Sequence, residues 1–156
     1  MASDDEKQIG LTGRRRKRQI SYFRFTYLDA SKKIRLYGID APEKKQKCKK
    51  TYLTISFMSF TKDYMCGEVS TQKLIKKINK QILNCNILDV DRYKRLIGEC
   101  FKRNINLNSW MVSNGYAVAY RKYSKKYVSD EINAKNNKLG IWQGKFEMPW
   151  DFRRKN

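Results

Sequence analysis

The first third of the chain alternates aromatic and aliphatic runs with short polar breaks. Residues 20–27 and 33–38 are rich in Tyr, Phe, Ile and Arg, and a break at 29–31 separates them. Such runs bounded by turn residues predict two strands of a meander. The second strand is expected to end at 40–43, where Pro42 restricts the preceding residue and cannot donate to a ladder.

A second pair of strand-like runs lies in the middle of the chain. Residues 82–88 and 96–101 flank the polar segment 89–92, which has the composition of a turn. This arrangement predicts a β-hairpin. A further short strand is expected at 116–120.

Three segments show the apolar spacing of helices. In 69–80 apolar residues recur on one face, and Ser70 is the expected N-cap. Further helices are expected at 107–114 and 130–138, with a glycine shortly after each to end it.

These elements together predict a fold that is mainly β with helices (α+β). Five strands with no recurring strand–helix–strand unit favour a five-stranded OB-type Greek-key barrel with about three helices. At 156 residues one domain is expected, spanning 20–156. Residues 1–19 are expected to be a basic N-terminal arm or leader without fixed structure.

The chain is strongly basic. It has 35 Lys and Arg against 15 Asp and Glu, a formal net charge of +20, and no histidine. Lack of imidazole excludes Ser-His-Asp and Cys-His catalysis and His-ligated zinc. The charge favours a polyanionic partner, nucleic acid or an anionic membrane, although it could serve solubility alone. A membrane coat is disfavoured because no predicted helix is both amphipathic and basic on one face.

Four cysteines stand far apart and form no CxxC pair: Cys48, Cys66, Cys85 and Cys100. Cys85 and Cys100 would face each other across the predicted hairpin, which would leave Cys48 and Cys66 to bracket a loop at 49–65. Two disulfides would indicate an extracytoplasmic compartment, and four reduced buried cysteines are the alternative. The segment 1–19 has no apolar h-region, so no signal peptide is expected in this chain.

Two acidic residues and two arginines form a candidate site for phosphodiester hydrolysis without histidine. Arg35 precedes Asp40 and Glu43 by a few residues, and Arg95 follows the turn of the predicted hairpin. An aspartate can hold Ca²⁺ or Mg²⁺, a glutamate can orient or deprotonate water, and arginines can bind a phosphate. An ordinary acidic turn is the competing interpretation.

Four blocks resemble the thermonuclease family, the staphylococcal-nuclease-like domains, in the order in which that family carries them. They cover about 33–154 and read IRLYGIDAPE, DRYKRLIGECF, LNSWMVSNGYAVAYRKYS and AKNNKLGIWQGKFEMPWDFRR. The resemblance implies an OB-fold barrel. It also implies Ca²⁺-dependent cleavage of DNA and RNA at the 5′ side of the phosphodiester, with Mg²⁺ as the other candidate ion.

The resemblance also implies roles for individual residues. Arg35 and Arg95 match the family's phosphate-binding and transition-state arginines, and Glu43 matches the glutamate assigned to water activation. Asp40 matches the metal-ligand aspartate, and Ala41 falls where a backbone carbonyl binds the metal. Positions that match or suggest contacts to nucleic acid are Tyr93, Tyr120, Lys94, Lys125 and Lys126; half-buried packing or a solvated basic face is the alternative for them.

Two positions depart from the family pattern. Phe25 stands where a second metal-ligand aspartate is expected, and losing an anionic ligand should weaken the site. Asp29 could substitute in another register. Lys94 replaces a glycine between the tyrosine and arginine of DRYGR. The rival hypothesis is therefore an OB-fold nucleic-acid-binding module with little or no catalysis.

The remaining expectations concern partners and compartment. The resemblance implies DNA and RNA as partners, and the chain shows no sign of an obligate protein partner, which leads us to expect a monomer. A secreted or periplasmic location is expected from the cysteines and the family. No run of apolar residues reaches the 18 needed to span a bilayer.

Overall fold

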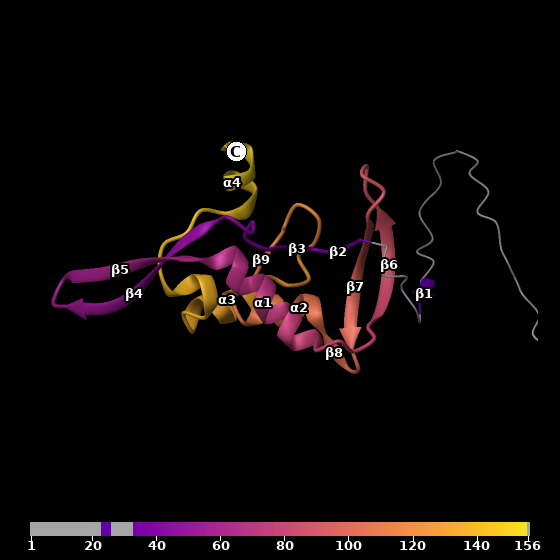
Figure 1. The fold of residues 1–156 in the computed structure, drawn as a ribbon, viewed down its shortest axis with the longest axis horizontal. Coiled ribbons are helices and arrows are strands. Elements are labelled where there is room, and N and C mark those ends of the chain that lie inside the picture. Colours follow the sequence, from indigo (N-terminus) through magenta and orange to yellow (C-terminus); the bar gives the residue numbers. More distant parts are fainter. Residues whose placement is uncertain (1–22, 26–32, 156) are drawn as a thin grey trace, which may run out of the picture.

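The computed structural model describes residues 23–25 and 33–155, and Figure 1 shows the course of the chain. Strands come first and helices are interleaved later. In chain order the elements are β1 (Phe23–Phe25), β2 (Ile34–Leu36), β3 (Ile39–Asp40), β4 (Lys47–Ile55), β5 (Met58–Met65), α1 (Cys66–Ile78), β6 (Asn84–Val90), β7 (Leu96–Lys102), β8 (Ile105–Asn106), α2 (Leu107–Ser113), β9 (Val118–Ala119), α3 (Val128–Asn136), the 3₁₀ helix η1 (Gly140–Gln143) and α4 (Pro149–Lys155).

The largest sheet is built around the predicted hairpin. β6 and β7 pair antiparallel, β1 adds to β6, and β2 adds to β7 in parallel, with Arg35 opposite Ile97. The two N-terminal strands are therefore not neighbours, and the predicted meander is wrong. The longer β6–β7 hairpin separates them because each of its edges accepts one short strand.

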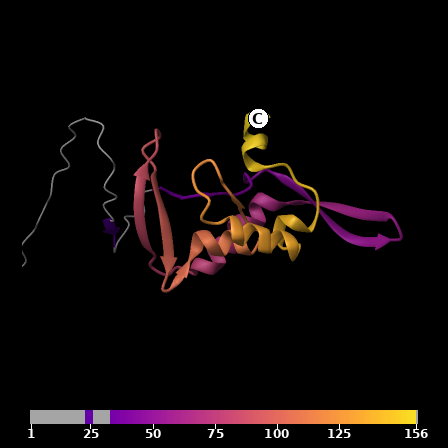
Figure 2. The same cartoon turned by 180° about the vertical axis from the view of Figure 1, so that it is seen from behind.

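A second hairpin replaces the loop expected at 49–65. β4 and β5 pair antiparallel from Lys47 opposite Met65 to Ile55 opposite Met58, with a bulge between Thr51 and Leu53. Both strands contain Thr and Tyr, and β4 adds Ile and β5 adds Phe, all of which favour extended structure. The hairpin extends away from the helices at one end of the described part (Figures 1 and 2).

The predicted disulfides both form. Cys85 and Cys100 are directly opposite on β6 and β7, and Cys48 of β4 is bonded to Cys66 at the start of α1. All four sulfurs lie in buried residues. The first bridge joins β6 to β7 within their hairpin, and the second joins the base of the β4–β5 hairpin to the start of α1.

Helix α1 begins at Cys66, three residues before the predicted start, and Ser70 is buried inside the helix instead of capping it. The start is set by tertiary contacts. The disulfide holds Cys66, and a Cβ on Gly67 would lie 1.8 Å from the carbonyl oxygen of Glu43. Only glycine allows the helix to approach that turn so closely.

Helices α2 and α3 agree with the sequence-based prediction within about two residues at each end. Helix α4 was not predicted. It begins at Pro149, a favoured residue for the first helical position, and carries three basic residues in its last turn.

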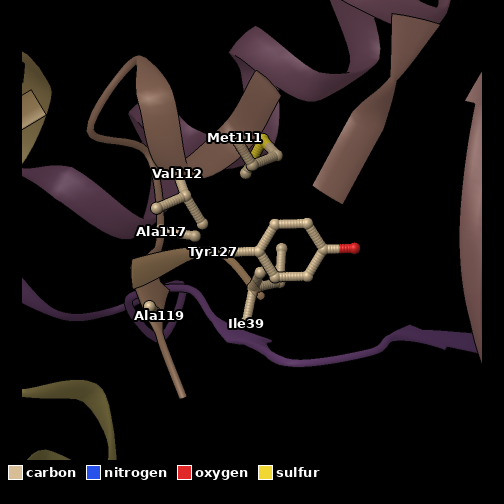
Figure 3. Close-up of a cluster of buried hydrophobic side chains, with 6 residues drawn as sticks. All are labelled: Ile39, Met111, Val112, Ala117, Ala119 and Tyr127. Carbon is tan, nitrogen blue, oxygen red and sulfur yellow. The ribbon is translucent and has the colours of Figure 1, made fainter. Parts of the chain in front are cut away.

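A hydrophobic cluster lies under the segment that carries the candidate site. Ile39 of β3 packs with Met111 and Val112 of α2 and with Tyr127 at the start of α3 (Figure 3). Ile39 directly precedes Asp40 in the chain. Packing of Ile39 in this cluster therefore holds the backbone at Asp40 in place.

The predicted α+β class and OB-type fold are confirmed, and the described residues form four α-helices where about three were expected. The described strands are divided among three sheets: the one around β6–β7, the β3–β9 pair and the β4–β5 hairpin. No helix in 33–155 is long and apolar enough to cross a bilayer. The prediction for residues 1–19 lies outside the described residues.

Candidate active site

One open pocket of about 580 Å³ brings the predicted catalytic residues together. Arg35 enters it from β2, and Arg95 enters it from the turn that leads into β7. Asp40, at the end of β3, and Glu43, three residues later, provide the acidic side. Residues separated by up to 60 positions in the sequence thus share one pocket, and Ala41 and Tyr93 also line it.

The acidic corner is held by its own backbone. The amide of Gln46 donates to the carbonyl of Glu43 at 2.7 Å, and the amide of Glu43 donates to the Gln46 side chain at 3.2 Å. Gln46 is fully buried and donates in turn to the carbonyl of Glu147 at 2.6 Å. This buried amide ties the turn that carries Glu43 to the segment preceding α4.

Arg153 of α4 is a pocket residue that the sequence did not single out. Its guanidinium donates to both carboxylate oxygens of Asp40, at 3.0 and 2.5 Å, and to Glu43 Oε1 at 2.7 Å. The hydrogen bond to Asp40 is the main reason that the pKa of Arg153 is raised; desolvation opposes the rise and Glu43 adds to it. Arg35 approaches the same carboxylate less closely, with its Nη2 4.0 Å from Asp40 Oδ1.

Nothing local in the sequence distinguishes Arg153 from its neighbours. It lies in a run of three cations, Arg153-Arg154-Lys155, in a chain that has 35 Lys and Arg. Arg154 instead pairs with Asp151 on the same helix, and Lys155 pairs with Glu147 at 2.6 Å. Of the three cations, Arg153 alone lines the pocket.

Arg95 is oriented by the turn that precedes it. Asp91 accepts hydrogen bonds from the backbone amides of Tyr93 and Arg95 at 2.8 and 2.9 Å, and from Arg95 Nε at 2.6 Å. Desolvation would raise the pKa of Asp91, but these hydrogen bonds outweigh it and lower that pKa. The carboxylate thereby fixes one edge of the guanidinium and leaves its other edge available.

Two residues beside Arg95 bear on the predicted nucleic-acid contacts. Tyr93 is 63 % exposed, and the guanidinium carbons of Arg92 and Arg95 lie 4.8 and 5.3 Å from its ring centroid. Lys94 has a φ of 59°, in the left-handed region that favours glycine. This backbone conformation accounts for the glycine that the family usually carries there.

The described residues contain no aspartate at the position expected for the second metal ligand. Phe25 lies on β1 with its backbone opposite Cys85, and Asp29 falls outside the described residues. Within 23–25 and 33–155, no three Asp, Glu, Cys or His side chains are grouped closely enough to hold a metal ion. Asp40 is therefore the principal anionic ligand that the described part of the chain could offer, with Glu43 beside it.

The other predicted contact residues have different surroundings. Tyr120 stacks on Trp150 of α4 with ring centroids 5.2 Å apart and an 8° interplanar angle. Lys125 is exposed. Lys126 Nζ, in contrast, lies 2.6 and 2.8 Å from the two carboxylate oxygens of Glu99.

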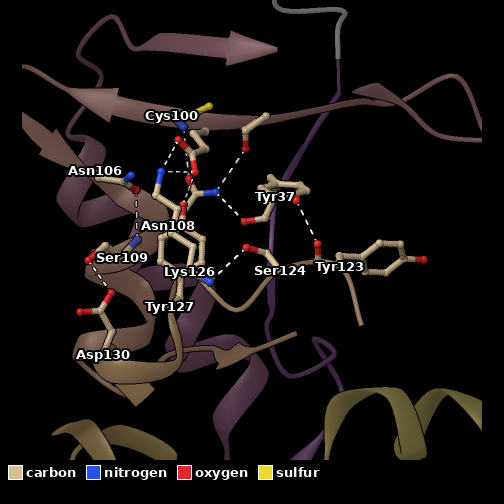
Figure 4. A network of polar contacts seen from close by, with 12 residues as sticks. Tyr37, Cys100, Asn106, Asn108, Ser109, Tyr123, Ser124, Lys126, Tyr127 and Asp130 are labelled. Atoms are coloured by element: carbon tan, nitrogen blue, oxygen red, sulfur yellow. Dashed lines mark hydrogen bonds and ion pairs between the residues drawn. The ribbon is translucent and has the colours of Figure 1, made fainter. Parts of the chain in front are cut away.

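Lys126 belongs to a polar network that joins β7, α2 and the start of α3, drawn in Figure 4. Glu99, which is 8 % exposed, also accepts a hydrogen bond from the Tyr127 hydroxyl at 2.7 Å. Asn108 joins the backbones of Tyr37 and Cys100 in the same region. Because Glu99 already compensates the charge of Lys126, that lysine is a poor candidate for a phosphate contact.

Comparison with known proteins identifies the family. Residues 33–144, well over half of the chain, match the family described as staphylococcal nuclease homologue. The chain belongs to this family. The resemblance inferred from the sequence blocks is thereby confirmed.

Several curated proteins are similar over most of this chain. A probable staphylococcal-like nuclease of Oryza sativa subsp. japonica is 30 % identical over 125 residues, covering 78 % of this chain. A succinoglycan biosynthesis protein of Rhizobium meliloti is 31 % identical over 121 residues, or 76 % of this chain. An uncharacterized endonuclease of Escherichia coli is 29 % identical over 127 residues, which is 79 % of this chain and 71 % of that protein.

The extent of these matches differs between relatives. The matched region spans 28 % of the rice protein and 59 % of the Rhizobium protein. This chain therefore covers less than two thirds of the length of either relative.

Proposed function

We propose that this chain is a calcium-dependent endonuclease that hydrolyses DNA and RNA at the 5′ side of the phosphodiester. Membership of the nuclease family supports hydrolysis of nucleic acid as the class of activity. The observation that carries the proposal is the convergence of Arg35, Asp40, Glu43 and Arg95 on one open pocket. Together they supply cations for a phosphate and a carboxylate for water.

Each side chain has a role that follows from its position. Arg35 and Arg95 donate to the oxygens of the scissile phosphate from two sides of the pocket. Glu43, 42 % exposed at its side chain, is accessible enough to accept a proton from the attacking water. Water adds to phosphorus, the bond to O5′ breaks, and a proton passes to O5′, which leaves a 5′-hydroxyl and a 3′-phosphate.

The metal would be held by hard oxygen donors, namely Asp40 and the backbone carbonyl of Ala41. These donors suit Ca²⁺ in kind, and a bound ion would neutralise charge on the phosphate. They are few, however, and Arg153 engages both oxygens of Asp40. The fit therefore requires the guanidinium of Arg153 to release the carboxylate, and we expect a weaker site than one with two free aspartates.

A nucleic-acid-binding module without turnover is the second candidate. The contacts of Arg153 to Asp40 and Glu43 favour it, since they place a fixed cation on the carboxylates that catalysis would need. The basic surface and the exposed ring of Tyr93 would serve binding in either case.

We also propose that the protein acts as a monomer in a secreted or periplasmic setting. The two disulfides support that compartment, because such bonds persist in oxidising environments. Tyr120, Lys94 and Lys125 are proposed to contribute to nucleic-acid binding around the pocket.

The deciding experiment is cleavage of end-labelled single-stranded DNA and RNA under non-reducing conditions with Ca²⁺, with Mg²⁺ and with EDTA. We expect cleavage with Ca²⁺, none with EDTA, and products that carry a 5′-hydroxyl and a 3′-phosphate. Binding of the oligonucleotide without cleavage in either metal would replace the enzyme with the binding module. Products with a 5′-phosphate would contradict the proposed side of attack.

A further inference from the structure

The β4–β5 hairpin presents its apolar residues to solvent. Phe57 at the tip is 93 % exposed, and Ile55 and Met58, which pair across the strands, are 58 % and 54 % exposed. The next apolar pair, Leu53 and Phe60, is also exposed. An exposed apolar cluster of this kind on the surface of a protein indicates an interaction site.

The pairing register of β4 and β5 places the apolar residues of the two strands on one face of the hairpin. Side chains two positions apart in a strand share a face, so the Leu53–Phe60 and Ile55–Met58 pairs lie on the same side. The intervening pair, Thr54 and Ser59, lies on the opposite side with its hydroxyls 3.4 Å apart. The distal hairpin is thus apolar on one face and hydroxylic on the other.

In the distal part of the hairpin it is the hydroxyl face that lies beside the domain. Thr51, Thr54 and Ser59 line a groove together with Trp142 and Gln143 of η1. The hydroxyl face therefore looks toward the body of the domain. The apolar face is buried only at the base of the hairpin, where Cys48 and Tyr64 pack in a core cluster. Beyond Lys50 and Lys62 its apolar residues are exposed in the described part of the chain.

Two lysines follow the apolar residues toward the base of the hairpin. Lys50 and Lys62 are directly opposite, and alternation puts them on the apolar face; both are exposed. Lys49 pairs with Asp63 at 3.0 Å, but no carboxylate in the described part of the chain pairs with Lys50 or Lys62. Like charges facing each other across a ladder are unfavourable, and an external anion would relieve their repulsion.

We infer that the β4–β5 hairpin docks on the surface of an anionic lipid bilayer, with its tip in the interface and its lysines among the headgroups. Rows on one face are about 7 Å apart, since a strand rises about 3.4 Å per residue. Two apolar rows therefore match the about 5–10 Å to which interfacial elements enter a bilayer. Lys50 and Lys62 would then lie near the lipid phosphates.

The charge of the chain favours a lipid over a second copy of the protein. Each copy carries a formal net charge of +20, so apolar association of two hairpins would bring like charges together. Single-stranded nucleic acid could stack on the rings of Phe57 and Phe60, but the exposed aliphatic side chains of Leu53, Ile55 and Met58 offer it no stacking surface and suit burial among acyl chains. The inference is independent of the proposed catalysis, because the hairpin tip does not line the catalytic pocket.

The test uses the full chain, with Phe57→Trp as a reporter at the tip and the parent protein as the spectroscopic blank. Vesicles of phosphatidylcholine mixed with phosphatidylglycerol are expected to shift the fluorescence emission of the introduced tryptophan to the blue. Vesicles with brominated acyl chains are expected to quench this emission. Pure phosphatidylcholine vesicles should bind much more weakly. Unshifted emission on vesicles that do bind the protein would overturn the inference, as would a failure to bind.

Charge-matched variants separate insertion from general attraction to an anionic surface. Ile55→Asp, on the apolar face, is expected to weaken vesicle binding by ~10-fold or more, whereas Thr54→Asp, on the hydroxyl face, changes the charge equally and should have much less effect. Removing Lys50 and Lys62 should weaken binding about fivefold for each lysine. Equal losses for the two aspartate variants would show that net charge alone binds the membrane.

Two controls complete the test. Thermal unfolding and circular dichroism of both aspartate variants confirm that the hairpin is retained, which the Cys48–Cys66 bond at its base favours. A single-stranded oligonucleotide is titrated in parallel against the Phe57→Trp protein. A blue shift with the oligonucleotide and none with vesicles would assign the hairpin to nucleic acid and reject the membrane.

Discussion

Arg153 of α4 binds both carboxylate oxygens of Asp40 on β3, at 3.0 and 2.5 Å. The same guanidinium reaches Glu43 at 2.7 Å. A cation from the C-terminal helix therefore engages the two acidic residues to which metal binding and water activation are assigned. The relationship places Arg153 in competition with any divalent ion at this site.

The first prediction concerns that competition. Arg153→Ala should raise the affinity for Ca²⁺ by about tenfold, because a hydrogen bond to a charged group is worth about 1.5–3 kcal/mol and the ion would no longer have to displace it. Isothermal titration calorimetry measures the effect without any turnover. Arg154→Ala is the matched control, since Arg154 pairs with Asp151 on its own helix; equal affinities in the two variants would contradict the competition.

The second prediction concerns Glu43. Glu43→Gln should slow hydrolysis by at least ~10²-fold, the range expected for a lost general base, while oligonucleotide binding changes little. Single-turnover cleavage and fluorescence anisotropy measure the two quantities. Glu68→Gln, which removes an exposed carboxylate from α1, should leave both unchanged. A small effect of Glu43→Gln on cleavage would mean that another group activates the water.

The third prediction separates Arg95 from the general positive charge. Arg95→Ala should lower kcat by ~10²–10³-fold and weaken binding much less, because a contact that strengthens in the transition state appears in kcat. The control is Arg103→Ala, which removes an equal charge from an exposed turn between β7 and β8. If Arg95→Ala reduced binding and turnover by the same factor, its role would be ground-state binding alone.

The fourth prediction concerns pH and Asp91. Its pKa is lowered in the folded state from an ordinary value of 3.8, so its contribution to stability is present above that value and is lost as the pH falls through the lower folded pKa. Asp91→Asn should therefore have a lower Tm than the parent near neutral pH, with a gap that closes in acid.

Thermal unfolding followed from neutral to strongly acidic pH tests this effect. Asp63→Asn is a useful comparison, because an exposed pair such as Lys49–Asp63 contributes little to stability. A gap for Asp91→Asn that stayed constant down to strongly acidic pH would show that the lost hydrogen bonds, and not ionisation, set the difference.

The sequence by itself determined the elements whose interactions are local. Arg35, Asp40 and Glu43 lie within nine positions of one another, so β2, β3 and the short connections beside them suffice to bring them together. The β6–β7 hairpin was likewise predictable, because two extended runs flank a polar turn and a cysteine pair sits across them. These features also carried the resemblance that revealed the family.

Tertiary structure decided the contacts that join distant segments. Asp40 and Arg153 are 113 positions apart, and Lys126 and Glu99 are 27 apart, so no local pattern could select these partners from 35 cations. Only the packing of α4 beside β3 places Arg153 on the acidic pair. The same holds for the β4–β5 hairpin: alternation can predict two faces, but which face meets the domain and which meets solvent depends on where the rest of the chain packs.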